Sequence, residues 1–142
     1  MGDPIIIRNP TMSLQSLDAA GVPTGTAVDV SPDVAQVALA PTVPTTTVTT
    51  FAGKFTATDD PEWGNATAGI VVNEDTATNW AALVGDRVEV KIYDRAELTW
   101  YRRFISEVIY NPALAGSTQP GSARTSDFPL PVLSTVTIVE EV

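Results

Sequence analysis

An alternation of apolar and charged side chains over residues 87–93 constrains the fold of this chain more than any other feature. A period of two residues is typical of a β-strand that has one apolar and one charged face. Residues 98–110 follow after a turn at 94–97 and are rich in β-branched and aromatic side chains, which predicts a second long strand. The two segments together predict an antiparallel β-hairpin.

A short helix is predicted directly before this hairpin. Thr76 or Thr78 offers a side-chain hydroxyl that can cap the first turn, and Gly85 is suited to end the helix. Between them, Trp80, Leu83 and Val84 follow the i, i+3, i+4 spacing of one helix face. We therefore expect the helix and the hairpin that follows it to form one structural unit.

The rest of the chain predicts shorter strands that are separated by turns. Extended patterns cover residues 12–17, 27–30, 34–39, 45–57, 70–72 and 134–139. Residues 127–133 continue this series, although Pro129 and Pro131 break the pattern. With the long hairpin, these segments amount to about seven or eight strands and one short helix. The sequence therefore predicts a mainly β fold, an antiparallel β-sandwich or barrel with the short helix flanking it on one side.

The length of 142 residues fits a single domain. Residues 1–11 contain two prolines and a run of three isoleucines, and we expect them to form an N-terminal arm that pairs with a sheet edge. Residues 12–142 then form the β domain. Two segments of biased composition, residues 41–50 and 112–125, are predicted to be long loops in that domain.

The composition excludes several classes of chemistry. The chain has no Cys and no His, which rules out disulfides, zinc sites with Cys or His ligands, Cys nucleophiles and Ser-His-Asp triads. Its net charge of −9 disfavours nucleic-acid binding through phosphate neutralisation, but it suits a surface that DNA passes without sticking. No apolar run reaches the roughly 18 residues needed to cross a bilayer. Because the N-terminus does not resemble a signal peptide, we expect synthesis in a cytoplasm without export.

Three groups of residues could carry chemistry, and each has a simpler structural interpretation. Asp59, Asp60 and Glu62 could bind calcium, but they lack the spaced ligands of a calcium loop and are expected to form a solvated turn. Glu89 and Glu107 could form a catalytic carboxylate pair, but basic residues on the same strands would neutralise them. Core or interface packing is favoured over a sugar-binding platform for the three tryptophans, Trp63, Trp80 and Trp100. The sequence therefore predicts no enzyme, no metal site and no cofactor.

Four features keep a fixed order along residues 12–139. They are the threonine-rich run at 45–50 with Phe51 and Gly53, the short strand at 70–73, the helix-to-strand joint at 80–90 and the closing segment at 127–133. In this order the chain resembles the major tail tube protein of long-tailed, non-contractile (siphovirus-type) bacteriophages. The resemblance implies a phage tail tube-like fold, in which a β-sandwich flanked by a helix forms hexameric rings. The rings stack into the tube through which DNA passes into the host.

The resemblance also implies roles for three sets of residues. The charged face of the 87–93 strand would line the channel, with Arg87, Glu89 and Lys91 facing the lumen. The apolar face would pack under the helix, in a core of Trp80, Leu83, Val84, Val88, Val90 and Ile92. The arm, the 41–50 loop and the 112–125 loop would reach neighbouring subunits or rings. Residues proposed for these contacts are Ile5, Ile6, Ile7, Thr45, Thr46, Thr47, Val48 and Thr49.

The same resemblance implies a protein of the virion tail that is assembled in the host cytoplasm. It would act without a cofactor or a membrane and without specific binding to the passing DNA. Its partners would be further copies of itself and the tape measure, tail terminator and distal tail proteins. A tail terminator or head-tail connector ring protein is the alternative within a virion. Outside a virion, a carbohydrate-binding β-sandwich and a small hydrolase are the alternatives.

Overall fold

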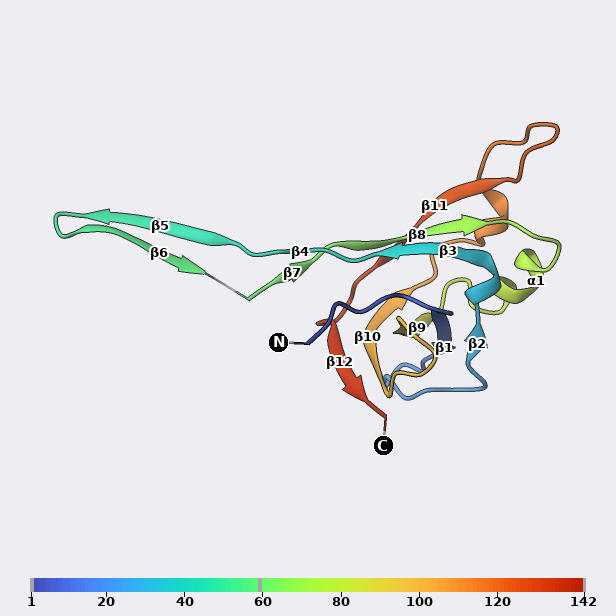
Figure 1. Ribbon diagram of the computed structural model, residues 1–142, viewed down its shortest axis with the longest axis horizontal. Helices are drawn as coiled ribbons and strands as arrows, with labels where there is room; N and C mark the ends of the chain where they lie inside the picture. Colours follow the sequence, from blue (N-terminus) through green and yellow to red (C-terminus); the bar gives the residue numbers. More distant parts are fainter. Residues whose placement is uncertain (1, 59, 142) are drawn as a thin grey trace.

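The body of the protein is built from two antiparallel β-sheets that lie face to face, as seen in a computed structural model that describes residues 2–58 and 60–141 (Figure 1). The larger sheet has five strands. In spatial order these are β12 (Thr137–Glu140), β10 (Trp100–Glu107), β9 (Arg87–Tyr93), β1 (Thr11–Ser16) and β2 (Val28–Asp29). The smaller sheet contains β11 (Thr125–Pro131), β8 (Asn65–Val71) and β3 (Val34–Ala38). The predicted mainly β, antiparallel fold is confirmed, and the sheets of the described residues form no closed barrel.

The core lies between the two sheets. Trp80 packs edge to face on Phe128 with ring centroids 5.3 Å apart, and Tyr110 contacts the same ring from another direction at 5.0 Å. Phe104 from the larger sheet and Leu130 from the smaller one are also fully buried. Each such side chain contributes about 2 kcal/mol through removal of apolar surface from water. Through Phe128, the aromatic cluster therefore packs Trp80 and Tyr110 onto the smaller sheet.

Strand β9 occupies the centre of the larger sheet, and its alternation matches the pattern expected for residues 87–93. Val88, Val90 and Ile92 point into the core, and β9 pairs over six residues with β1 and over six residues with β10. Trp80 and Leu83 belong to the same core cluster. The expectation for Val84 is wrong, because its side chain is 40% exposed. Helix α1 (Thr76–Ala81) ends before Val84, so the helical spacing that would have turned this side chain inward is not continued.

The predicted caps of helix α1 are also wrong. Asp75 is the N-cap residue and makes no side-chain cap bond. The Thr76 hydroxyl accepts a hydrogen bond from the backbone N–H of Asn73 instead of from a helical N–H group. Gly85 has a φ of +83°, but it lies four residues beyond the end of the helix. It therefore shapes the connection to β9 and does not end the helix.

The carboxylate of Asp33 is fully buried and organises the end of the sandwich at which the helix lies (Figure 1). It accepts hydrogen bonds from Asn73 Nδ2 at 2.5 Å, Thr76 Oγ1 at 3.0 Å and Trp80 Nε1 at 3.0 Å. Asp33 itself lies in the short 3-10 helix η1 (Ser31–Asp33), where the chain crosses from β2 in one sheet to β3 in the other. One carboxylate thus joins this crossover to the helix and its preceding turn.

The segment predicted as a long loop at residues 41–50 is mostly strand, which corrects that expectation. It contains β4 (Pro41–Thr42) and β5 (Thr45–Thr50), which pair with β7 (Glu62–Trp63) and β6 (Gly53–Thr58), respectively. The predicted continuous strand over 45–57 is instead reversed by a two-residue turn at Phe51 and Ala52. The β-branched threonines favour extended backbone, and Gly53 with a φ of +129° allows the sharp reversal.

Proline did not interrupt the strand predicted at 127–133. β11 includes Pro129 and Pro131, and it pairs with β8 alone, at the edge of the smaller sheet. A proline lacks a backbone donor but is tolerated where the strand has a free side. In the other predicted loop, the 3-10 helix η2 (Pro112–Leu114) is followed by residues 115–124, which form neither helix nor strand.

We expect Asp33→Ala to lower the free energy of unfolding by about 3 kcal/mol or more, because three buried donors lose their acceptor. Chemical denaturation measures this loss. Asp127→Ala is the matched control, since Asp127 is exposed on β11 and its side chain makes no hydrogen bond among the described residues; its effect should stay within about 0.5 kcal/mol. Equal effects of the two substitutions would contradict the organising role of Asp33.

Candidate functional site

A long two-stranded projection is the most unusual feature of the molecule. The chain leaves the smaller sheet after β3, runs outward through β4 and β5, and returns through β6 and β7 to β8 (Figure 1). Register is continuous in the outermost part, where Thr45 pairs with Thr58 and Thr50 with Gly53. We call the β5–β6 part, residues 45–58, the projecting hairpin.

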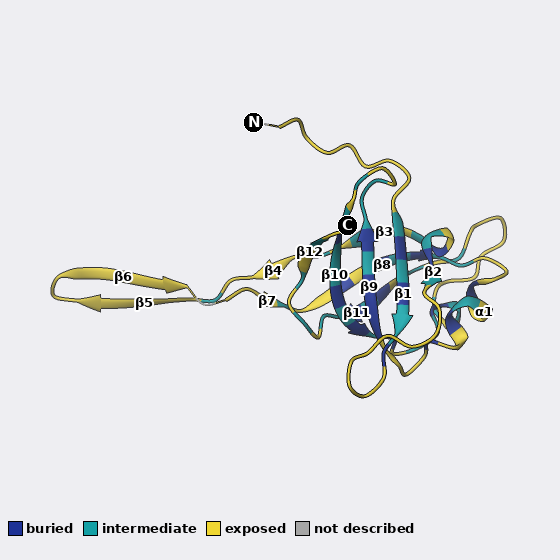
Figure 2. Cartoon of the chain, turned by 90° about the horizontal axis from the view of Figure 1, so that it is seen from below, coloured by how far each residue is buried: buried dark blue, intermediate teal, exposed yellow. Residues whose placement is uncertain are grey.

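Every residue of β5 and β6 is exposed, as Figure 2 shows by the uniform colour of the hairpin. Val48, Phe51 and Phe55 are large apolar side chains among them, and Phe51 at the turn is fully exposed. An isolated two-stranded hairpin is at best marginally stable in water. Its apolar side chains and its two unpaired strand edges make the projecting hairpin the candidate site of this molecule.

Of the predicted contact residues, five lie on β5 and three on the N-terminal arm. Thr45, Thr46, Thr47, Val48 and Thr49 are all exposed on the projecting hairpin. Ile5, Ile6 and Ile7 are between 50% and 63% exposed on the arm. The arm is tied to the body by a single backbone bridge between Arg8 and Arg95, and it leaves the body in a different direction from the hairpin (Figure 2). These are two separate exposed apolar segments.

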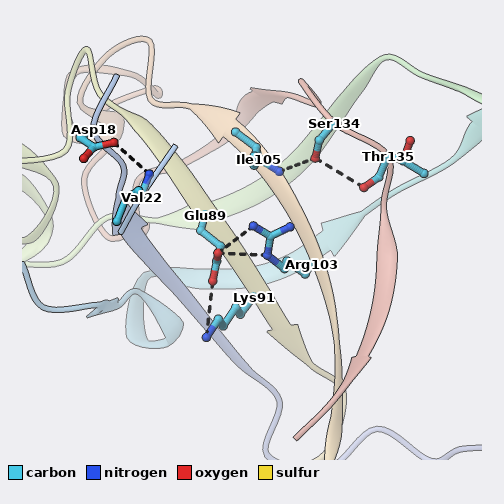
Figure 3. Close-up of polar contacts among 8 residues, drawn as sticks. All are labelled: Asp18, Val22, Glu89, Lys91, Arg103, Ile105, Ser134 and Thr135. Atoms are coloured by element: carbon cyan, nitrogen blue, oxygen red, sulfur yellow. Dashed lines mark hydrogen bonds and ion pairs between the residues drawn. The ribbon is translucent and has the colours of Figure 1, made fainter. Parts of the chain in front are cut away.

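The predicted lumen residues lie on the outer face of the larger sheet, away from the core. Glu89 is nearly buried there, because its carboxylate is held by Arg103 and Lys91 (Figure 3). Arg103 Nη2 and Nε lie 2.9 and 3.0 Å from Glu89 Oε2, and Lys91 Nζ lies 3.5 Å from Oε1. Arg87 is exposed and makes no ion pair among the described residues. The charged face is therefore an ion-pair cluster around one carboxylate.

Tyr93 closes this face at the far end of β9. Its hydroxyl donates a hydrogen bond of 2.9 Å to Glu141 Oε1, and its ring lies 5.0 Å from that of Tyr101. Lys91 Nζ lies 5.1 Å from the centre of the Tyr101 ring. Partial burial, followed by the hydrogen bond and the negative charge of Glu141, raises the pKa of Tyr93 to about 12.

A cavity of about 230 Å³ opens between the two sheets. Its apolar lining includes Ile7 from the arm, Met12 from β1, Val37 from β3 and Ile92 from β9. Arg102 of β10 also lines this cavity. Ile92 therefore borders a cavity in addition to its place in the core.

The residues considered for chemistry are not assembled into a site. Asp59 lies outside the described residues, and the described part of the chain holds no group of three or more His, Cys, Asp or Glu side chains placed to bind a metal. Glu89 is engaged by two cations, and Glu107 lies opposite Arg87 on the neighbouring strand. Trp80 is fully buried, which contradicts a sugar platform of three tryptophans. Among the described residues, no helix has the length and apolar character of a membrane span.

Comparison of the sequence with protein-family models and with curated protein sequences gives no match.

One part of this surface was missed by sequence reasoning. Phe55 lies opposite Val48 across the projecting hairpin. A two-residue turn fixes the register of the two strands, so the position of the turn would have predicted this pair. The predicted neutralisation of Glu89 by basic residues of the same two strands is confirmed by its ion pairs with Arg103 and Lys91.

We expect Glu89→Ala to lower the free energy of unfolding by about 1–2 kcal/mol, because Arg103 and Lys91 lose a nearly buried partner. Chemical denaturation of Glu89→Ala, Arg103→Ala and the double variant gives the coupling between the two side chains, expected to be about 1 kcal/mol. Glu107→Ala on the adjoining strand is the control. Additive single effects would show that the ion pair contributes no stability.

The raised pKa of Tyr93 predicts a pH dependence with a defined sign. Between pH 10 and about 12 the unfolded chain releases this proton while the folded chain retains it, so stability falls as the pH rises through that window. An ultraviolet absorbance titration should show one tyrosine that ionises near pH 12, and Tyr93→Phe should remove this late transition. Glu141→Gln should move that transition toward pH 10. A late transition that persists in Tyr93→Phe would contradict the assignment.

Proposed function

We propose that this protein is a structural subunit that assembles with copies of itself into hexameric rings, and that these rings stack into the tail tube of a long-tailed, non-contractile bacteriophage. In this role it is a non-enzymatic virion component that is assembled in the host cytoplasm. The tape measure, tail terminator and distal tail proteins are its further partners. DNA passes through the tube without being bound specifically.

The observation that carries the proposal is the projecting hairpin. It exposes Val48, Phe51 and Phe55 on a thin extension that has no packing of its own outside the pairing of β5 with β6. Such an extension gains stability when neighbouring molecules cover it. A contact between a projection on one copy and another surface on the next copy is heterologous, and it generates rings or stacks.

The architecture of the body agrees with the same role. Two antiparallel sheets with a single short flanking helix are the arrangement that the resemblance to tail tube proteins implies. The larger sheet also ends in β12, a four-residue strand without proline that pairs only with β10. A free edge of this kind is suited to pairing with a strand of a neighbouring molecule.

Charge supports the proposal in a more general way. A net charge of −9 repels phosphate groups, which favours passage of DNA over binding. On the outer face of the larger sheet, Glu89 forms ion pairs with Arg103 and Lys91, and Glu107 lies opposite Arg87, so charges of both signs are presented there. Arg87, Glu89 and Lys91 remain our candidates for the lumen.

Negative-stain electron microscopy of the purified protein over a range of concentrations tests the proposal. We expect hexameric rings and stacked tubes at high concentration. Isolated rings that never stack would favour a tail terminator or head-tail connector protein. A protein that stays monomeric at every concentration would refute both roles.

A shortened variant tests the part played by the projecting hairpin. Replacing residues 45–58 with a short Gly-Ser turn removes only exposed strand residues, so the free energy of unfolding should change by no more than about 1 kcal/mol. We expect a folded protomer that forms no tubes. Tubes of normal length from this variant would show that the hairpin does not take part in assembly.

A further inference from the structure

The side chain of Phe51 is the most exposed large apolar group of the described residues. It sits at the two-residue turn that joins β5 to β6, at the end of the projection farthest from the body (Figure 1). The turn is held in shape by Thr50, whose hydroxyl accepts a hydrogen bond from Ala52 N and donates one to Gly53 O. Phe51 is therefore presented on an ordered turn, in a position to enter a concave surface elsewhere.

The two faces of the projecting hairpin differ in character. Register places Val48 opposite Phe55 on one face, and Thr47 opposite Thr56 on the other. Lys54 lies on the threonine face, opposite Thr49, and it is the only charged residue of the projecting hairpin. The hairpin thus carries an apolar tip and a single positive charge, while the chain as a whole is strongly acidic.

The cavity between the sheets has the features that such a tip requires. Its volume is about 230 Å³, and its lining includes Met12, Val37 and Ile92. An apolar cavity of about 150 Å³ is enough to hold a benzene molecule, so this one can accept a phenyl ring. Asp94 lies at the same cavity and supplies a carboxylate for an approaching Lys54.

Arg102 adds a second, independent indication that the cavity receives an aromatic group. Its Nη2 donates a hydrogen bond of 2.9 Å to Asp94 Oδ1, which fixes the guanidinium at the cavity. Its Nε is buried and finds no hydrogen-bond acceptor among the described residues. The face of an aromatic ring attracts a guanidinium and can accept an N–H group. A phenyl ring in the cavity would therefore satisfy a donor that is otherwise unpaired.

We propose that Phe51 of one copy inserts into this cavity of a second copy, against Arg102, with Lys54 directed toward Asp94. The inference deepens the proposed function, on which it rests, by naming both sides of one contact between subunits. Because the tip and the cavity lie on different parts of the molecule, each copy offers both, and the contact repeats from copy to copy. The partner is thus a second molecule of the same chain.

The absence of native cysteine allows a direct test by disulfide cross-linking. Ala52→Cys places a thiol beside Phe51 without removing it, and Gln36→Cys places one at an exposed position in the cavity lining. The two single variants of the full chain are mixed, oxidised mildly and separated on a non-reducing gel, with isotopic or tag labelling to identify mixed dimers. We expect a mixed dimer that reduction dissolves.

Matched variants show whether Phe51 drives the contact. Adding Phe51→Ser to the Ala52→Cys variant should reduce the mixed dimer about tenfold or more, since burial of a phenyl side chain contributes at least that factor. Val22→Ser is the control, because Val22 is also exposed but lies in another loop. Leu114→Cys replaces Gln36→Cys as the control position outside the cavity.

The outcomes separate this inference from the proposed function. A mixed dimer that forms equally with Leu114→Cys, or that survives Phe51→Ser, would overturn the insertion of Phe51. Rings or tubes that form without the Ala52 to Gln36 cross-link would also overturn it, while leaving the structural role of the protein intact. A wild-type protein that stays monomeric would instead refute the proposed function.

Discussion

The buried carboxylate of Asp33 is the interaction on which the rest of the structure depends. It lies at the one place where the chain passes from the larger sheet to the smaller one before the projection begins. Its three donors come from the turn and helix that lead back to β9, so the crossover and the return are fixed to each other. A buried charge is costly unless it is fully hydrogen-bonded, and here that requirement enforces one arrangement of three segments. Trp80 takes part in both this network and the aromatic core.

Much of the body could be predicted from the sequence, because its strands follow the hydrophobic period. The alternation over residues 87–93 gave the correct face to Val88, Val90 and Ile92, since a strand buried on one side must alternate. Val84 was misassigned because the helical period was extended past the actual end of the helix at Ala81. The role of Asp33 was not foreseeable, since its three partners lie at least 40 residues away in the sequence. Local patterns carry no information about such long-range hydrogen bonds.

The candidate site was predicted only in part, for a different reason. The threonines and Val48 predict extended backbone from residue 45 on, whereas the prolines predict a loop over residues 41–44. Strand formation there depends on pairing with Gly53–Thr58, and a turn of two ordinary residues, Phe51 and Ala52, gives no sequence signal comparable to Asn-Gly. The cavity beside Arg102 is formed by residues from the arm and four strands, so it becomes visible only after folding. A surface built from several segments cannot be predicted from local sequence patterns.

Three prolines restrict the backbone at the base of the projection. Pro41 and Pro44 on the outgoing chain, and Pro61 on the returning chain, fix the backbone φ angle where the projection joins the body. The strands behind them, β3 and β8, are anchored in the smaller sheet, where β8 also forms seven residue pairs with β11. A load on the tip is therefore transmitted as shear across these pairs, which must be broken together and not one after another. The projection is thus attached to the body at its base by both of its strands, and a pull on it is resisted first by the residue pairs of the smaller sheet.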